Sequence, residues 1–220
     1  MKKNNLKKLI NSKGFTLVEL LVTLSIFAVT TGIVMTSQGK FDNSVLLTNT
    51  AYDIAITIRQ AQTYGVNVKE SLVSNKYNPY GVRFDLSISD GDNKRFNLFE
   101  DSLTVNNIHN NIQDGNFICT SSDEECVNSY KLKRGHYIKS ICVGTNESDC
   151  DTNAINTSRL DISFVRPNPE AVILGVISGI PDTFSSTNPR KFAKIVISSA
   201  DDTAKRSIVV TKVGQIYVKK

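Results

Sequence analysis

The sequence predicts an α+β protein in which a long N-terminal helix precedes an antiparallel β-sheet or sandwich domain. Three observations support this fold class. A basic leader is followed by a long apolar run that ends at Met35. A second group of apolar residues recurs at helical spacing as far as Ala61. From about residue 66 the apolar residues alternate with polar ones, which is the period of a β-strand.

The first 35 residues predict a membrane-spanning helix with its N-terminus inside. Residues 1–14 contain lysines at positions 2, 3, 7, 8 and 13 and no acidic residue. The apolar run from Phe15 to Met35 is 21 residues long, close to the ~20 residues that span a bilayer. Because positive residues stay on the cytoplasmic side, the domain beyond the run is expected outside. A secretory signal peptide is the alternative, but its apolar region has only ~7–15 residues.

One carboxylate, Glu19, lies near the start of the apolar run. Burying an ionised side chain in lipid costs about 3 kcal/mol or more. The helix dipole favours a carboxylate in the first turn, but by no more than ~1 kcal/mol. Since the dipole does not offset the cost of burial, Glu19 is predicted to have a function. An inert acid at the membrane interface is the alternative.

The segment Lys13-Gly14-Phe15-Thr16-Leu17-Val18-Glu19 resembles the processing site of type IV pilins and of the pseudopilins of type II secretion. The resemblance covers roughly the first 35 residues. It implies that a prepilin peptidase cuts after Gly14 and methylates the new N-terminus at Phe15. It also implies that Glu19 pairs with the amine of a neighbouring subunit during filament assembly.

A second helical segment is predicted after the apolar run. Leu47, Ala51, Ile54, Ile58 and Ala61 recur at spacings of four and three residues, which places them on one helical face. A kink or local unwinding is expected in the polar stretch before them, residues 37–43. Within the family, the segment 52–62 is most similar to the minor, initiating pseudopilins.

Four parts of the chain are therefore expected. They are a cleaved leader at 1–14, a transmembrane and polymerisation half of the helix at 15–36, an amphipathic half at 37–65, and an extracytoplasmic antiparallel β domain at 66–220.

The β domain is expected to contain both half-buried and more deeply buried strands. Alternation of apolar and polar residues at 82–88 and at 160–164 predicts two strands with one solvent-exposed face. Continuous apolar runs at 171–177 and 195–197 predict more buried strands. The last two segments, 207–211 and 215–218, are predicted to form a closing hairpin.

The four cysteines predict disulfides. Six residues separate Cys119 from Cys126, and seven separate Cys142 from Cys150. An even number of cysteines in a domain expected outside the cytoplasm favours disulfide bonds, and local pairing is the simplest of three connectivities. A zinc site is the alternative, but the spacing lacks paired C-x₂₋₄-C ligands. Neither loop matches a regular calcium-binding loop, so no metal or cofactor is predicted.

No enzyme motif is found in the sequence. The G-x-S-x-G, phosphate-loop, H-E-x-x-H and dinucleotide-binding patterns are all missing. The two histidines, His109 and His136, lie in polar and basic turns, where a surface position is expected. The chain is therefore predicted to be a structural and assembly protein rather than an enzyme.

Net charge does not predict nucleic-acid binding. The chain has 26 Lys+Arg and 21 Asp+Glu, and removal of the five leader lysines would leave equal numbers. Basic residues do gather near the C-terminus, where Lys212, Lys219 and Lys220 are possible DNA contacts. Lysines on an exposed strand that protect its edge are the alternative.

The sequence as a whole predicts a minor pilin or pseudopilin of a type IV pilus or a type II secretion-like filament. By resemblance, its partners are other pilin subunits, the prepilin peptidase, the inner-membrane assembly platform and, before assembly, membrane lipid. It is expected in the cytoplasmic membrane and then in a filament at the cell surface or in the periplasm. The alternatives are a DNA-binding minor pilin and a membrane-anchored binding domain that does not polymerise.

Overall fold

The computed structural model describes residues 14–67, 77–86, 92–102, 104–105, 108–109, 111–113, 117, 119, 125–152, 157–177, 180–181 and 190–220. The chain divides into two compact units, Met1–Asp42 and Asn43–Lys220. The described part of the first unit is mostly helical. The second unit contains the rest of that helix and all of the β-strands.

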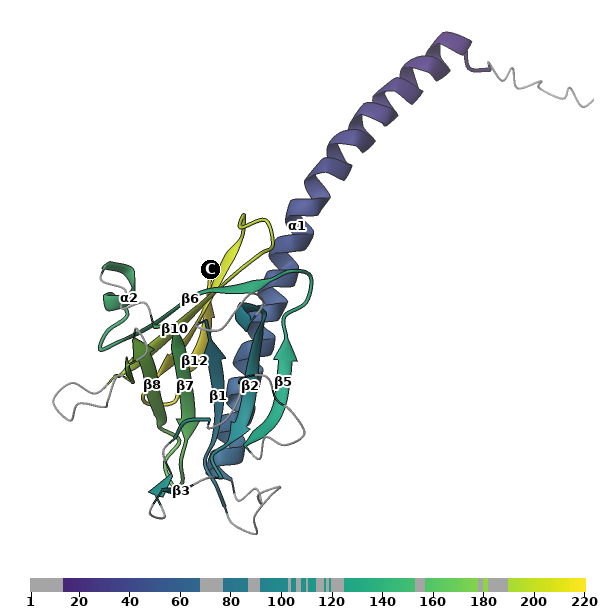
Figure 1. Cartoon of the computed structure of the whole chain (residues 1–220). Helices are drawn as coiled ribbons and strands as arrows, with labels where there is room; N and C mark the ends of the chain where they lie inside the picture. Colours follow the sequence, from purple (N-terminus) through teal and green to yellow (C-terminus); the bar gives the residue numbers. More distant parts are fainter. Residues whose placement is uncertain are drawn as a thin grey trace, which may run out of the picture. The chain divides into compact units, whose positions relative to one another are not determined.

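Helix α1 runs from Leu17 to Val66 and is drawn as the long ribbon of Figure 1. Both predicted helical segments lie within it. Its backbone is helical through the polar stretch 37–43 as well, so the local unwinding expected there does not occur. Both compact units therefore contain a part of the same helix.

The second half of α1 forms the centre of the hydrophobic core. The predicted apolar stripe from Leu47 to Ala61 is fully buried and packs with side chains from both large sheets. The helix ends close to a strand, since a Cβ atom on Gly65 would lie 2.3 Å from the carbonyl oxygen of Phe164. Only glycine permits that close an approach.

Six antiparallel strands make the larger sheet, in the order β5-β2-β1-β7-β8-β9. Figure 1 labels the run from β5 to β8. The short 3₁₀ turn Asp92–Lys94 leads into β2. The strands are β1 (Tyr80–Asp85), β2 (Arg95–Glu100), β5 (Cys126–Lys131), β7 (Arg159–Phe164), β8 (Ala171–Ile177) and β9 (Ile180–Pro181).

Four antiparallel strands make the second sheet, in the order β12-β11-β10-β6. Their bounds are β6 (Tyr137–Gly144), β10 (Phe192–Ser198), β11 (Lys205–Thr211) and β12 (Ile216–Lys219). The predicted closing hairpin is thus confirmed as β11 and β12. The remaining elements are the pair β3 (Thr104–Val105) and β4 (Ile108–His109) and the short helix α2 (Asp149–Thr152).

The fold class is the α+β arrangement that the sequence predicts. The prediction that two strands have a solvent-exposed face is wrong. Strands β1 and β7 were expected to expose their polar residues to solvent. Instead Arg83, Asp85 and Asp161 are each at most 4% exposed, and Gln113 and Phe117 lie against Arg83 on this face. Strand β1 also ends at Asp85, and Ile88, its last predicted apolar residue, lies outside the described residues.

Candidate membrane-insertion and processing site

Thr16 begins helix α1 as its N-cap. Its carbonyl oxygen accepts the first intrahelical hydrogen bond, from the Leu20 amide at 3.1 Å. Its side-chain Oγ1 accepts a hydrogen bond from the Glu19 amide at 3.2 Å. Thr16-Leu17-Val18-Glu19 matches the S/T-x-x-E pattern of a capping box. Sequence analysis missed this role of Thr16, although the pattern was present in the sequence.

The predicted cleavage bond joins two residues that precede the helix. Gly14 and Phe15 have neither helical nor strand backbone. The Phe15 side chain is 81% exposed, and a Cβ on Gly14 would meet no atom within 4 Å. In the described part of the chain this bond is sterically open to another protein.

The first half of α1 is apolar on all sides. Leu17–Met35 has a mean hydropathy of 2.2 with no part buried inside the chain, so it is long and apolar enough to cross a membrane. A helix that is apolar all round is stable only in a core or in lipid. The residues Thr23, Thr30 and Thr31 suit such surroundings, because their hydroxyl groups donate to carbonyl oxygens of the preceding turn.

Glu19 is the only ionisable residue between Leu17 and Met35. It lies in the first turn of α1 and its side chain is exposed. The helix dipole favours a carboxylate at this end, and the Thr16 cap fixes the backbone of the same turn. The arrangement presents one negative charge at the start of an otherwise uncharged apolar helix.

The structure pairs all four cysteines locally, as Cys119–Cys126 and Cys142–Cys150. The Cα atoms of both pairs are 5.7 Å apart, within the range that a disulfide requires. The first bond joins Cys119, which comes after β4 in the chain, to the first residue of β5. The second closes the loop between β6 and α2. Bonds of this kind are typical of an oxidising compartment.

The three lysines predicted as DNA contacts do not lie together. Lys212 follows β11 at the hairpin turn, whereas Lys219 is opposite Ser207 at the far end of the same hairpin. The two ends of β11 in this hairpin, Ser207 and Thr211, are four residues or about 14 Å apart. Lys219 forms a salt bridge with Glu147, and Lys220 is exposed beside it. The arrangement provides a pair of lysines at one end rather than a continuous basic surface.

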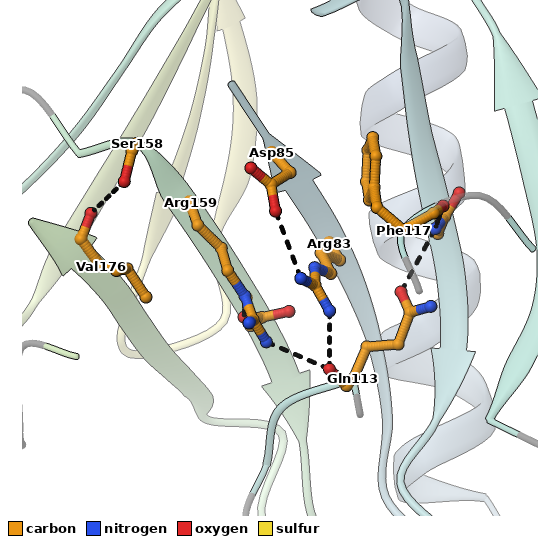
Figure 2. Close-up of polar contacts among 9 residues, drawn as sticks. Arg83, Asp85, Gln113, Phe117, Ser158, Arg159 and Val176 are labelled. Atoms are coloured by element: carbon orange, nitrogen blue, oxygen red, sulfur yellow. Dashed lines mark hydrogen bonds and ion pairs between the residues drawn. The ribbon is translucent and has the colours of Figure 1, made fainter. Parts of the chain in front are cut away.

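A buried ionic cluster lies on the face of the six-stranded sheet that points away from the hydrophobic core (Figure 2). Arg83 from β1 and Arg159 from β7 both donate to the carbonyl oxygen of Gln113, at 2.7 and 3.1 Å. Each also pairs with a carboxylate, Arg83 with Asp85 at 3.2 Å and Arg159 with Asp161 at 2.8 Å. Sequence analysis missed this cluster because alternating charged residues are also typical of a solvated face.

The charges of this cluster balance, which favours a structural role. Burial raises the pKa of Asp161 to about 6, and the neighbouring Arg159 and Arg83 oppose that shift. The Arg83 guanidinium also lies 5.8 Å from the centre of the Phe117 ring. The two arginines therefore hold Gln113 and Phe117 against the sheet through hydrogen-bond and cation–π contacts.

His136 was expected at the surface, and that expectation is wrong. Its side chain is 2% exposed, and its Nδ1 lies 2.9 Å from the hydroxyl of Thr50 on α1. Burial and the neighbouring Arg134 lower its pKa, while Asp201 opposes the shift. Only the backbone of His109 is described. Among the residues with described side chains, no three His, Cys, Asp or Glu residues gather where they could hold a metal ion.

Comparison with known protein families gives one match. Residues 9–35 match the model of the prokaryotic N-terminal methylation motif, so this segment is similar to the leader and first helix of type IV pilin-like proteins. The matched range contains Gly14, Phe15, Thr16 and Glu19. No curated protein and no solved structure matches the chain. The motif and the apolar helix thus fall on the same N-terminal segment, which is similar to the membrane-anchoring start of pilin-like proteins.

Proposed function

We propose that the chain is a minor pilin or pseudopilin, a structural and assembly subunit of a type IV pilus or a type II secretion-like filament. In this proposal a prepilin peptidase cuts between Gly14 and Phe15 and methylates the new N-terminus. The mature subunit then leaves the membrane and packs by α1 into a filament, with its β domain outward. The other partners are the inner-membrane assembly platform and neighbouring pilin subunits.

The observation that carries the proposal is the combination of residues at the start of α1. An open Gly14–Phe15 bond precedes an N-cap at Thr16, and one carboxylate follows in the first turn of an all-round apolar helix. A plain membrane anchor has no use for Glu19, because lipid burial of the carboxylate is costly. A positive N-terminus on a neighbouring subunit offsets that cost, since it supplies the opposite charge in a medium of low dielectric constant.

Cleavage would also change the electrostatics of the chain. Loss of the five leader lysines removes the residues that hold the N-terminus at the cytoplasmic side. The mature chain then has equal numbers of basic and acidic side chains. Removal of this anchor favours extraction of α1 from the membrane into a helical bundle, where other α1 helices replace the lipid tails.

The assignment to the minor, initiating branch rests on the similarity of the segment 52–62 and is part of the proposal. A DNA-binding role has no comparable support. Of the three lysines, Lys212 is separated from Lys219 and Lys220, and Lys219 is already paired with Glu147. DNA binding remains a prediction that a salt titration with duplex DNA would test.

The proposal is tested by the intact mass of the chain purified from its native membranes. The expected mass lacks residues 1–14, contains one additional methyl group, and is four hydrogens lighter because of two disulfides. An uncut N-terminus, or cleavage beyond Met35, would contradict the pilin pathway. The rival proposal, an anchored binding domain that does not polymerise, predicts that substitution of Glu19 leaves function unchanged.

A further inference from the structure

A groove lies between the second half of α1 and the edge of the six-stranded sheet. Its volume is about 380 Å³. The helix contributes Asp53 and Ile56 to one wall, and the sheet contributes Phe96, Tyr130 and Leu132 to the other. Strand β5 is the edge of this sheet in the described part of the chain. The groove is therefore open to a neighbouring molecule along one side of the β unit.

The groove has an exposed apolar lip. Ile56 is 62% exposed, while its neighbours Ile54 and Ile58 are fully buried in the core. Val45 and Tyr52 are also exposed, at 42% and 53%. Spacings of seven and four residues place these three side chains on one face of α1. This unpartnered apolar strip borders the groove through Ile56.

The sheet wall of the groove is rigid and aromatic. The rings of Phe96 and Tyr130 are stacked, with their centres 5.2 Å apart and their planes 14° from parallel. Phe96 also stacks on Phe84 at 5.6 Å, which connects the wall to the core. A preformed aromatic wall opposite an exposed isoleucine suits one or two apolar side chains of a partner, at a low cost in conformational entropy.

The rim of the groove is positively charged. Lys131 and Lys133 line it, Arg134 follows in the same turn, and all three are exposed. Within the described part of the chain no carboxylate forms a salt bridge with any of the three. Among the described residues that line the groove, Asp53 on the helix wall is the one that is acidic. Two lysines against one carboxylate in the described lining, with Arg134 next in the chain, are complementary to an acidic partner.

We infer that this groove is the docking site for an acidic amphipathic helix of a different, neighbouring pilin-like subunit. The groove follows α1 from Thr50 to Gln60, about 15 Å or three helical turns, so a helix laid along it could place apolar residues on both walls. The exposed helix of a second copy would not be acidic enough to fit this groove, because Asp53 is the only acidic residue in the sequence from Asn43 to Val66. This inference rests on the proposed function, since it takes a filament subunit as the partner.

Site-specific photo-crosslinking of the full chain in its native cells tests the inference. The photoreactive residue p-benzoyl-phenylalanine replaces Ile56 in the groove or, as the matched control, Val213, which is 63% exposed on the β11–β12 turn. The expected product at Ile56 is a crosslink to one chain with its own N-terminal methylation motif. The crosslinked peptide is expected to be an acidic helical segment, and the Val213 variant is expected to give no such product.

Charge reversal then tests the rim. In the chain that carries the crosslinker at Ile56, the double substitution Lys131→Glu and Lys133→Glu is expected to lower the yield at least tenfold. The control pair Lys212→Glu and Lys220→Glu changes the net charge equally and is expected to leave the yield unchanged. Intact mass with both disulfides, and unchanged resistance to chymotrypsin, whose aromatic and leucine sites the charge substitutions leave in place, would show that each variant is folded.

Several outcomes would overturn the inference. They are equal crosslinking at Ile56 and Val213, a crosslink to another copy of this chain, a peptide without carboxylates or from a β-strand, and a yield that the rim substitutions do not change. The proposed function fails differently, through an uncut leader or through assembly that does not depend on Glu19. A crosslink in the groove can be scored in either case, so the two failures are distinguishable.

Discussion

The two halves of helix α1 present the same backbone to opposite kinds of surroundings. In Leu17–Met35 no side chain is buried within the chain, and apolar residues lie on every face. From Asn43 to Val66 one stripe is fully buried, and the exposed side carries polar residues together with the apolar strip Val45, Tyr52 and Ile56. The comparison teaches that a helix is stabilised by what covers it. The first half requires lipid or other helices, while the second half is covered by its own β unit.

The largest effect is expected at the single charge of the first half. Glu19→Ala is expected to reduce the fraction of the chain found in filaments at least tenfold, because the unpaired amine of a neighbour would then be buried without a counter-charge. The measurement is quantitative immunoblotting of sheared filaments against membranes. Glu19→Asp, which keeps a carboxylate, is the control and should retain part of the assembly. Wild-type incorporation of Glu19→Ala would show that assembly does not require the carboxylate.

The second largest effect is expected on the free energy of unfolding, which should respond to a substitution in the second half of α1 and not to one in the first half. Ile58→Ala is expected to lower the free energy of unfolding of the β unit by about 2–5 kcal/mol, since it creates a cavity in the core. Leu24→Ala removes a similar volume from the first half and is expected to leave that free energy unchanged. Urea unfolding of the full chain in detergent measures both, and tyrosine fluorescence is a suitable signal because the chain has no tryptophan. Equal losses in the two variants would show that the halves are not independent.

The third effect compares two glycines of the same helix. A Cβ on Gly65 would lie 2.3 Å from the Phe164 carbonyl oxygen, whereas a Cβ on Gly32 would meet nothing within 4 Å. Gly65→Ala is therefore expected to destabilise the β unit by about 1–3 kcal/mol through overpacking. Gly32→Ala should leave the urea midpoint unchanged, although it favours the local helix by up to ~1 kcal/mol. A stable Gly65→Ala variant would mean that the helix can move away from β7.

The smallest effect is expected at Thr16, the N-cap of helix α1. Thr16→Ala removes the hydroxyl that accepts from the Glu19 amide and is expected to cost about 1 kcal/mol of local helix stability. Hydrogen exchange of the Glu19 amide should then be roughly fivefold faster. Thr23→Ala is the control, because its hydroxyl donates to the Leu20 carbonyl and caps no amide. An unchanged exchange rate in Thr16→Ala would show that the first turn is held by something else.

Local patterns predicted the helical parts of this molecule well. The stripe from Leu47 to Ala61 needs only the period of a helix, and each of its residues is fully buried in the core. The β11–β12 hairpin was equally accessible, since Gly214 lies at its turn and has a positive φ of 84°. These features depend on residues that are close together in the sequence.

The covered face of the larger sheet could not be predicted in the same way. Arg83 and Asp161 look like solvated residues in a strand pattern, and among the described residues the distant Gln113 and Phe117 help to cover them. Strand β2 was missed because a bulge between Leu98 and Phe99 interrupts its register with β5. The groove was missed for a related reason, because Ile56 and Tyr130 are 74 residues apart in the sequence.

The central position of α1 in the β unit determines how that unit would respond to tension. A pull on the first half enters the second unit through a helix that is attached along much of its length. Arg59 donates to the Ile216 carbonyl, and Gln62 donates to the carbonyls of Pro169 and Gly214. To pull α1 out of the β unit, these hydrogen bonds and the contacts of the buried stripe would have to break at the same time and not one after another. Within the β unit, a pull on α1 would therefore meet these hydrogen bonds and the buried stripe together.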